Sequence, residues 1–370
     1  MSQKRLFLLD AYALIFRGYY ALIKNPRINS KGMDTSAILG FVNSLLDVIN
    51  REKPDHLAVA FDNGGSHIRT EAFPEYKSNR LETPEAIKIA IPYIHKILEA
   101  MHIPIIEKVG FEADDLIGTL AKQAEKVGYQ TFMVTPDKDF AQLVSENIFM
   151  YKPSRMGNGI EKWGIPEVQA KFEVERPIQV IDLLGMMGDA VDNIPGLPGV
   201  GEKTAKKFIK EYGSMENLLA NTHQLKGKMK EKIEENKELG ILSKKLATII
   251  LDCPVEFHEE NFELNHPDFE KVGEIFKELE FRRASDNFNK IFNKQPSEIQ
   301  ESKTVEEPVQ TSKPTHSANQ QFDLFSLPPE HSIESSISSS YQSNDSYNHI
   351  YQFVNTSFSR KLLLNNFMFN

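Results

Sequence analysis

The chain has 370 residues, 40% of them hydrophobic and 26% charged, and a formal net charge of −9. This composition is typical of a globular protein with a large core, and the length favours two domains or one domain with a tail. The single cysteine, Cys253, excludes an internal disulfide framework. Because the N-terminus carries no apolar signal segment and no run reaches transmembrane length, we expect a cytoplasmic protein without a membrane partner.

Apolar runs alternate with helical patterns through the first part of the chain. We expect strands at residues 6–10, 57–61, 103–106 and 130–134, and helices at about 36–50, 84–101 and 113–128. Continuous apolar strands that alternate with helices indicate an α/β fold with a largely parallel sheet covered on both faces. From about residue 166 the pattern is helical. Beyond residue 292 polar residues and proline dominate, which predicts a disordered tail.

Acidic residues follow each of the four predicted strands. In open α/β sheets the functional crevice lies outside the carboxyl ends of the strands, so these side chains are expected to share one rim. The alternative for any single acid is that it suits a turn or the first turn of a helix. Two further acids lie three residues apart before a glycine-rich turn. The nine are Asp10, Asp62, Glu112, Asp114, Asp115, Asp137, Asp139, Asp189 and Asp192.

Nine carboxylates in one place would repel one another unless cations lay between them. Mg²⁺ takes oxygen ligands and keeps several waters, so many acids around few direct ligands are expected. Two such ions roughly 3.5–4 Å apart can activate a water and stabilise the leaving oxygen of a phosphodiester. Glu112 and Asp115, three apart on a helix, are expected near one ion, with Asp114 in an outer shell. The histidines are scattered and support neither a zinc site nor a catalytic triad.

A glycine-rich turn precedes a lysine-rich helix at residues 196–210. Glycines before a helix let the backbone approach a phosphate closely, and the spacing is not that of a P-loop. An ordinary turn between helices is the alternative. With its lysines, the turn favours sequence-independent binding of a duplex backbone. The predicted contacts are Gly199, Val200, Gly201, Lys203, Thr204, Lys206 and Lys207.

The segment after Asp62 mixes aromatic rings with cations, a combination that single-stranded nucleic acid needs. On a helix Phe73, Tyr76, Lys77 and Arg80 would fall on one face, and Arg69 lies one turn earlier. All five are expected to contact nucleic acid. The alternative is an exposed loop with incidental aromatic residues.

These motifs, in this order, closely resemble the 5′-nuclease family that includes flap endonucleases and the N-terminal 5′→3′ exonuclease domain of bacterial DNA polymerase I. The resemblance covers about residues 4–292. It implies that the nine acids hold two or more divalent metals, Mg²⁺ or Mn²⁺, and that residues 66–83 form a helical arch that gates the 5′ strand. It also implies catalytic roles for Lys77, Arg80, Asp10 and Asp115, with Tyr76 as a stacking residue. The turn at residues 199–205 resembles the family's helix–three-turn–helix, which grips duplex DNA and commonly holds K⁺.

We therefore expect a PIN-like catalytic domain at residues 1–174, a helical DNA-binding region at 175–292 and a tail at 293–370. The implied activity is hydrolysis of DNA flaps and primer RNA in replication and repair, near the nucleoid and beside a polymerase. The chain is expected to be a truncated polymerase I or an independent nuclease. In the tail, residues 321–325 resemble a sliding-clamp-binding peptide, with Gln321, Leu324 and Phe325 as anchors. The alternatives are a non-catalytic branched-DNA-binding module and a PIN-type ribonuclease.

Overall fold

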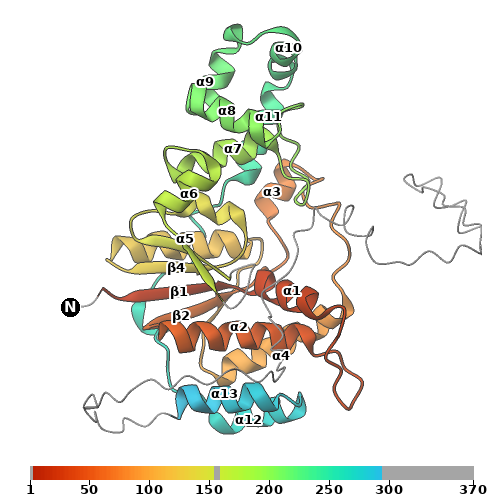
Figure 1. Cartoon of the computed structure of the whole chain (residues 1–370), viewed down its shortest axis with the longest axis vertical. Helices are drawn as coiled ribbons and strands as arrows, with labels where there is room; N and C mark the ends of the chain where they lie inside the picture. The colour runs from red at the N-terminus through yellow and green to blue at the C-terminus, as the bar shows by residue number, and fades with distance from the viewer. Residues whose placement is uncertain (1–2, 154–158, 294–370) are drawn as a thin grey trace, which may run out of the picture. The chain divides into compact units, whose positions relative to one another are not determined.

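The computed structural model describes residues 3–153 and 159–293, and these form a six-stranded sheet with helices on both faces and a helical region beyond it (Figure 1). The strands are β1 (Arg5–Asp10), β2 (His56–Ala60), β3 (Ile105–Ile106), β4 (Gln130–Val134), β5 (Ile148–Pro153) and β6 (Ile160–Trp163). The longer helices near the sheet are α1 (Ala11–Leu22), α2 (Ser36–Glu52), α4 (Glu85–Ala100), α5 (Ala113–Lys126), α12 (Phe269–Glu278) and α13 (Arg282–Phe292).

The shorter and later helices surround or follow these. They are α3 (His67–Ala72), α6 (Ile165–Phe172), α7 (Val180–Met187), α8 (Glu202–Tyr212), α9 (Met215–Ala220), α10 (Gly227–Glu235) and α11 (Lys237–Ala247). The 3₁₀ turns are η1 (Lys138–Leu143), η2 (Pro177–Gln179), η3 (Thr222–Gln224) and η4 (Glu259–Asn261). No helix in the described part of the chain combines the length and the apolar character needed to cross a membrane.

The sheet has the strand order β3-β2-β1-β4-β5-β6, and every neighbouring pair is parallel except β5 with the antiparallel edge strand β6. Central β1 pairs Asp10 with Ala60 of β2 and Leu9 with Val134 of β4. This register brings the carboxyl ends of β1, β2 and β4 to one edge. The segments that follow these strands therefore start close together, as expected for a parallel α/β sheet.

Alternation along β1 divides the core between the two faces of the sheet. Phe7 and Leu9 belong to an apolar cluster with residues of α1, α2, α4, α12 and α13, whereas Leu6 and Leu8 belong to a cluster with residues of α5. Figure 1 shows α2 and α4 below the sheet and α5 above it. Both faces are thus covered, which is why the strands are continuous apolar runs.

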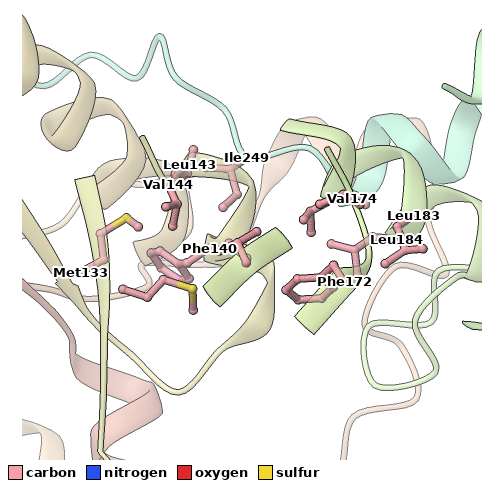
Figure 2. Packing of buried hydrophobic residues seen from close by; sticks show 14 of the residues in the cluster. Met133, Phe140, Leu143, Val144, Phe172, Val174, Leu183, Leu184 and Ile249 are labelled. Carbon is pink, nitrogen blue, oxygen red and sulfur yellow. The ribbon is translucent and has the colours of Figure 1, made fainter. Parts of the chain in front are cut away.

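The core on the α5 side continues into the helical region. Met133 of β4 and Phe140 of η1 lie in the same cluster as Phe172, Val174 and Leu184 (Figure 2). Residues on both sides of the domain boundary expected at residue 174 therefore pack in one apolar cluster. That boundary stays a prediction.

Several elements differ from the expectations. Helix α1, directly after Asp10, and the β5–β6 pair were not predicted, and β3 has only two residues. The segment at residues 73–80 is not helical, because α3 ends at Ala72 and Phe73 is extended before Pro74. The clamp-binding expectation for Gln321, Leu324 and Phe325 lies outside the described residues.

Candidate active site

Three acids of the rim lie at or just past the ends of neighbouring strands. Asp10 is the last residue of β1 and caps α1, accepting a hydrogen bond from the Ala13 amide at 3.1 Å. Its other oxygen accepts from the Thr135 hydroxyl at 3.1 Å. Asp62 follows β2 and accepts from the Ala113 amide at 2.6 Å, which ties this acid to the start of α5. Asp137 follows β4 and caps η1.

Asp10 is buried, Asp62 is half-buried and Asp137 is exposed, and the charges of Asp62 and Asp137 both act on Asp10. Burial, and then the charge of Asp62, raises the pKa of Asp10 to about 7. Burial, with the charge of Glu112 adding to it, also raises the pKa of Asp62. For Asp137, burial and the charge of Asp192 raise the pKa. These carboxyls therefore release their protons at higher pH than ordinary surface carboxyls do.

Three more acids lie at the amino end of α5. Glu112 is the N-cap of α5, and its amide donates to Oδ2 of Asp115 at 3.3 Å, so the helix start itself holds the Asp115 side chain. Ligand oxygens of Glu112, Asp114 and Asp115 all lie within 4.8 Å of one another, which is close enough to hold one ion. The pKa of Asp114 is raised well above its usual range by burial and by the neighbouring carboxylates. Among the described residues Asp114 forms no ion pair.

The last acidic pair lies on a tight loop between α7 and α8. Gly188 and Gly196 hold the base of this loop, with φ of +71° and +67°, and a Cβ on Gly196 would lie 2.5 Å from the Gly188 nitrogen. Above them Asp189 and Ile194 exchange backbone hydrogen bonds of 2.9 and 2.7 Å. This geometry points Asp189 toward Lys138 at 2.7 Å, and Asp192 toward Arg80 at 2.5 Å.

Asp139 lies between these groups. Burial and the charges of Asp137 and Asp189 raise its pKa well above the usual range. Its Oδ1 atom is buried and lacks a hydrogen-bond partner among the described residues. A buried carboxylate oxygen without a partner is costly, and a bound cation would satisfy it.

The segment between α3 and α4 lies on this rim. Lys77 places its ammonium 2.6 Å from Glu112 and 3.7 Å from Asp192. Two contacts to the acidic loop fix the segment: the Lys77 amide donates to the Asp192 carbonyl at 2.9 Å, and the Asn79 amide side chain donates to the Ala190 carbonyl at 2.7 Å. Lys77 and Arg80 thus reach the acids together, although not from one helical face.

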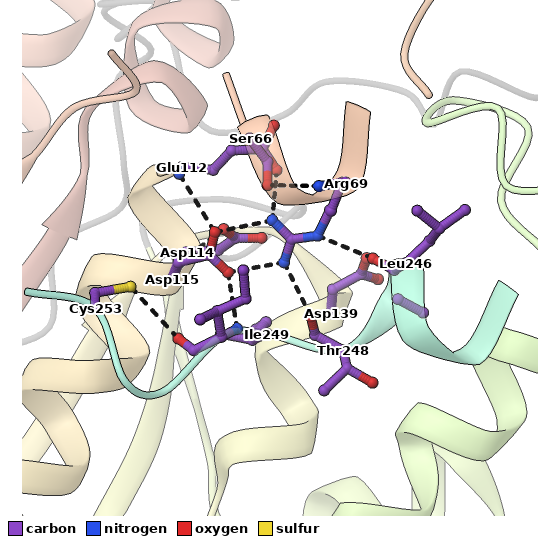
Figure 3. A network of polar contacts seen from close by, with 12 residues as sticks. Ser66, Arg69, Glu112, Asp114, Asp115, Asp139, Leu246, Thr248, Ile249 and Cys253 are labelled. Carbon is purple, nitrogen blue, oxygen red and sulfur yellow. Dashed lines mark hydrogen bonds and ion pairs between the residues drawn. The ribbon is translucent and has the colours of Figure 1, made fainter. Parts of the chain in front are cut away.

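Three residues of this segment were expected to contact DNA, and two of them, Arg69 and Tyr76, are instead buried while Phe73 is half-buried. Arg69 is 3% exposed and is enclosed by Glu112, Asp115 and two backbone carbonyls (Figure 3). Tyr76 is 8% exposed and donates its hydroxyl to Glu112 at 3.0 Å. Phe73 packs against the core. Their partners are distant in sequence, so spacing alone could not reveal their burial.

The glycine-rich turn opens α8 as expected, but not all of its predicted contacts are available. Gly199, with φ of +84°, and Gly201 are exposed, as are Lys203 and Lys207, and Thr204 is partly exposed. The Val200 side chain is buried in the core, so only its backbone could face a ligand. Lys206 is held by Glu202 at 3.0 Å and Glu173 at 3.2 Å, and is therefore not a free cation.

Other residues that sequence reasoning missed adjoin the rim. Lys138 pairs with Asp189, and the Thr135 hydroxyl joins Asp10 to the Asp137 amide. On α1 a row of rings leads away from Asp10, with Tyr12, Phe16 and Tyr20 spaced 6.4 and 6.2 Å between successive centroids. The four-residue spacing of these rings was the available signal for the helix.

A parallel sheet with acids along its carboxyl edge, joined to a helical part that opens with a glycine turn, defines a resolvase-like nuclease architecture. Residues 5–173 match the sequence model of the 5′-3′ exonuclease N-terminal resolvase-like domain, and residues 175–270 match that of the 5′-3′ exonuclease C-terminal SAM fold. The chain is 37% identical over 289 residues to a 5′-3′ exonuclease of Aquifex aeolicus, covering 78% of this chain and 96% of that protein. The chain belongs to the 5′-3′ exonuclease family, and it is an enzyme of that class.

A longer relative and two solved structures are also similar. DNA polymerase I of Bacillus caldotenax is 40% identical over 282 residues, which cover 76% of this chain and 32% of that protein. The chain thus matches about a third of the length of this relative. The T5 D15 protein co-crystallised with metal ions shares the fold, with a TM-score of 0.57 and 19% sequence identity. The match covers 78% of this chain and 100% of that chain. The catalytic core of Rad2 in complex with DNA substrate has a TM-score of 0.52 and 18% sequence identity, and the match covers 78% of this chain and 90% of that chain.

Proposed function

We propose that this chain hydrolyses phosphodiester bonds of DNA at or near a 5′ end, as a 5′→3′ exonuclease and 5′-flap endonuclease, with two or more divalent metal ions. Mg²⁺ is the proposed metal, and Mn²⁺ is expected to replace it. The observation that carries the proposal is the convergence of buried and half-buried, incompletely neutralised carboxyls on one edge of the sheet. The T5 D15 protein was co-crystallised with metal ions, which supports a metal cofactor but does not identify the metal.

The donor set fits hard divalent cations. It consists of oxygen ligands only, and burial raises the pKa of five of its carboxyls, those of Asp10, Asp62, Asp114, Asp137 and Asp139. Asp139 also carries an unpartnered buried oxygen among the described residues. Bound metal would supply an activated water and stabilise the leaving oxygen. The residues proposed to hold it directly or through water are Asp10, Asp62, Glu112, Asp114, Asp137, Asp139, Asp189 and Asp192.

Lys77 and Arg80 are proposed to neutralise and position the scissile phosphate. Their ion pairs with Glu112 and Asp192 place both charges at the rim. Lys77 is 20% exposed at its side chain and Arg80 is 47% exposed, so an incoming phosphate can reach both. Arg80 also offers a planar fork that suits a phosphate. The exposed ring of Tyr20 and the half-buried rings of Tyr12 and Phe16 on α1 would supply stacking surfaces for bases beside the rim.

The helical part is proposed to hold duplex DNA. Exposed Gly199 and Gly201, with Lys203 and Lys207 one turn into α8, suit contacts to phosphates without reading sequence. K⁺ bound to main-chain carbonyls of this turn is part of the proposal. The proposed substrates are nicked or branched duplexes with a 5′ single-stranded flap, and RNA-primer hybrids. The proposed partners in replication and repair are a polymerase on the same DNA and a sliding clamp.

One assay separates this proposal from a branched-DNA-binding module and from a ribonuclease. Cleavage of a labelled 5′-flap duplex is compared with cleavage of single-stranded RNA in Mg²⁺, in Mn²⁺ and in a chelator. Metal-dependent cutting of the flap beside its junction supports the proposal. Flap binding without cleavage would favour the binding module, and preferential cutting of single-stranded RNA would favour the ribonuclease.

A further inference from the structure

The side chain of Arg69 is enclosed by two segments that are distant from it in sequence, the start of α5 and residues 246–248 (Figure 3). It extends from α3 to the start of α5, where Nη2 lies 2.7 Å and Nη1 lies 2.8 Å from the two oxygens of Asp115. Nη1 also reaches Glu112 at 3.0 Å. On the remaining side Nε donates to the Leu246 carbonyl and Nη2 to the Thr248 carbonyl, each at 3.0 Å. All three guanidinium nitrogens thus have acceptors.

Both carboxylate oxygens of Asp115 are fully used by protein donors. Oδ1 accepts from Arg69 and from the Ile250 amide at 2.8 Å. Oδ2 accepts from Arg69 and from the Glu112 amide at 3.3 Å. A carboxylate offers about four acceptor positions, so none remains for a metal. Asp115 is also 0% exposed, and a metal could bind it only by breaking a buried, bidentate ion pair.

The neighbouring Asp114 has the opposite environment. Its side chain accepts from the Asp115 amide at 2.7 Å, and it has no ion-pair partner among the described residues. Glu112 keeps one oxygen, Oε1, whose contact is the movable ammonium of Lys77. Asp114 and Glu112 can therefore accept a metal cation, whereas Asp115 is already paired with the guanidinium of Arg69.

We propose that Asp115 is the counter-ion of Arg69 and not a metal ligand, and that Arg69 is a positioning residue that holds Glu112 and Asp114 at the rim. This inference rests on the proposed metal-dependent function. It reverses the expectation that Asp115 binds an ion directly while Asp114 stays in an outer shell. The same ion pair joins the base of the arch segment to α5 and to the segment after α11, so it couples the proposed gate to the acids.

The first test compares Asp115→Asn with Asp114→Asn by thermal unfolding in a chelator and by counting bound Mn²⁺. Asp115→Asn leaves the buried guanidinium without its counter-ion and should lower Tm by about 6–12 °C, with the Mn²⁺ stoichiometry of the wild type retained. Asp114→Asn removes an uncompensated buried charge, so Tm in the chelator at pH 8 should stay level or rise, while at least one Mn²⁺ is lost. The reverse pattern would overturn the inference.

The double variant Arg69→Met/Asp115→Leu covers the case in which Asp115→Asn does not fold. It removes both charges, so it should fold, with a Tm above that of Arg69→Met, in which the Asp115 carboxylate is left without its counter-ion. It should also bind as many Mn²⁺ ions as the wild type. A double variant that folds but has lost a Mn²⁺ ion would show that Asp115 is a ligand.

The positioning role of Arg69 is tested with Arg69→Lys, which keeps the charge but loses the planar fork. Outer groups that orient metal ligands typically change affinity by about 10–100-fold, so Mn²⁺ should bind that much more weakly with unchanged stoichiometry. Unchanged Mn²⁺ affinity in the folded variant would contradict the role. Failure of the proposed function would look different: the wild type itself would bind no Mn²⁺, while the unfolding measurements would still report on the ion pair.

Discussion

The ammonium of Lys77 lies 2.6 Å from the carboxylate of Glu112, although 35 residues separate the two in the chain. Lys77 has a left-handed backbone conformation, with φ of +57°, and its amide is held by the Asp192 carbonyl. The backbone therefore presents this side chain to the rim. The ion pair joins the segment that is proposed to meet the 5′ strand with the acids that are proposed to hold metal.

Replacement of Lys77 by alanine should mainly affect the chemical step. Loss of one charge that stabilises a transition state typically costs about 10²–10³-fold in kcat. We expect that loss in single-turnover cleavage of a 5′-flap duplex in Mg²⁺, with duplex affinity in Ca²⁺ changed by less than about threefold. Lys88→Ala, which removes an exposed cation that pairs with Glu82 away from the rim, is the matched control. Equal rates for Lys77→Ala and the control would contradict the assigned role.

The metal-free protein should lose stability as pH rises through the neutral range. The pKa of Asp10 in the folded protein is about 7, above its ordinary value of 3.8, so the folded state binds the extra proton. Its contribution is fully present below about pH 4 and is lost as pH rises through about 7. Asp10→Asn should therefore stabilise the metal-free protein at pH 8, by roughly 2–4 kcal/mol.

Divalent metal should reverse this dependence, because binding requires the deprotonated carboxyls. The increase in Tm on adding Mg²⁺ should be larger at pH 8 than at pH 5.5. Thermal unfolding across this range, with chelator and with Mg²⁺, measures both effects. A metal-induced increase in Tm that is larger at pH 5.5 than at pH 8 would contradict the assignment of the raised pKa values to a metal site.

Gly196 should tolerate no side chain. A Cβ there would lie 2.5 Å from the Gly188 nitrogen, and the φ of +67° is itself unfavourable for alanine. Gly196→Ala should lower the free energy of unfolding by about 1–3 kcal/mol. It should also slow cleavage, because it displaces Asp189 and Asp192. Gly273→Ala is the control, because its Cβ would meet no atom within 4 Å on helix α12. Urea unfolding should show a lower free energy of unfolding for Gly196→Ala than for Gly273→Ala, and the flap-cleavage assay should show a lower rate.

Lysines of α8 should differ in their contribution to duplex binding. Lys203→Ala and Lys207→Ala should each reduce the slope of log Kd against log salt by about 1, as expected for a lost phosphate contact. Lys206→Ala should change the slope less, since Glu202 and Glu173 already hold this ammonium. Fluorescence anisotropy of a labelled duplex over a salt series distinguishes them. Three equal slopes would show that the ion pairs of Lys206 open on DNA.

The acids were the most predictable part of the site. Parallel strands end at one edge, so the position of Asp10, Asp62 and Asp137 after three strands was sufficient to place them together. The different roles proposed for Asp114 and Asp115 at the start of α5 were not predictable, because they depend on Arg69. The position of Arg69 is in turn fixed by the carbonyls of Leu246 and Thr248. Helical spacing failed from Phe73 onward, because Pro74 forces the residue before it into an extended conformation.

The central claim is that metal bound at the acidic rim cleaves DNA near a 5′ end. The most direct measurement is the rate at which wild type and Asp10→Ala release the labelled 5′ product from a flap duplex as Mg²⁺ is titrated from zero. We predict no release in chelator, a saturable rise with Mg²⁺ for the wild type, and no detectable release by a folded Asp10→Ala that still binds the duplex. Cleavage that persists in chelator, or equal rates for the two proteins, would contradict the claim.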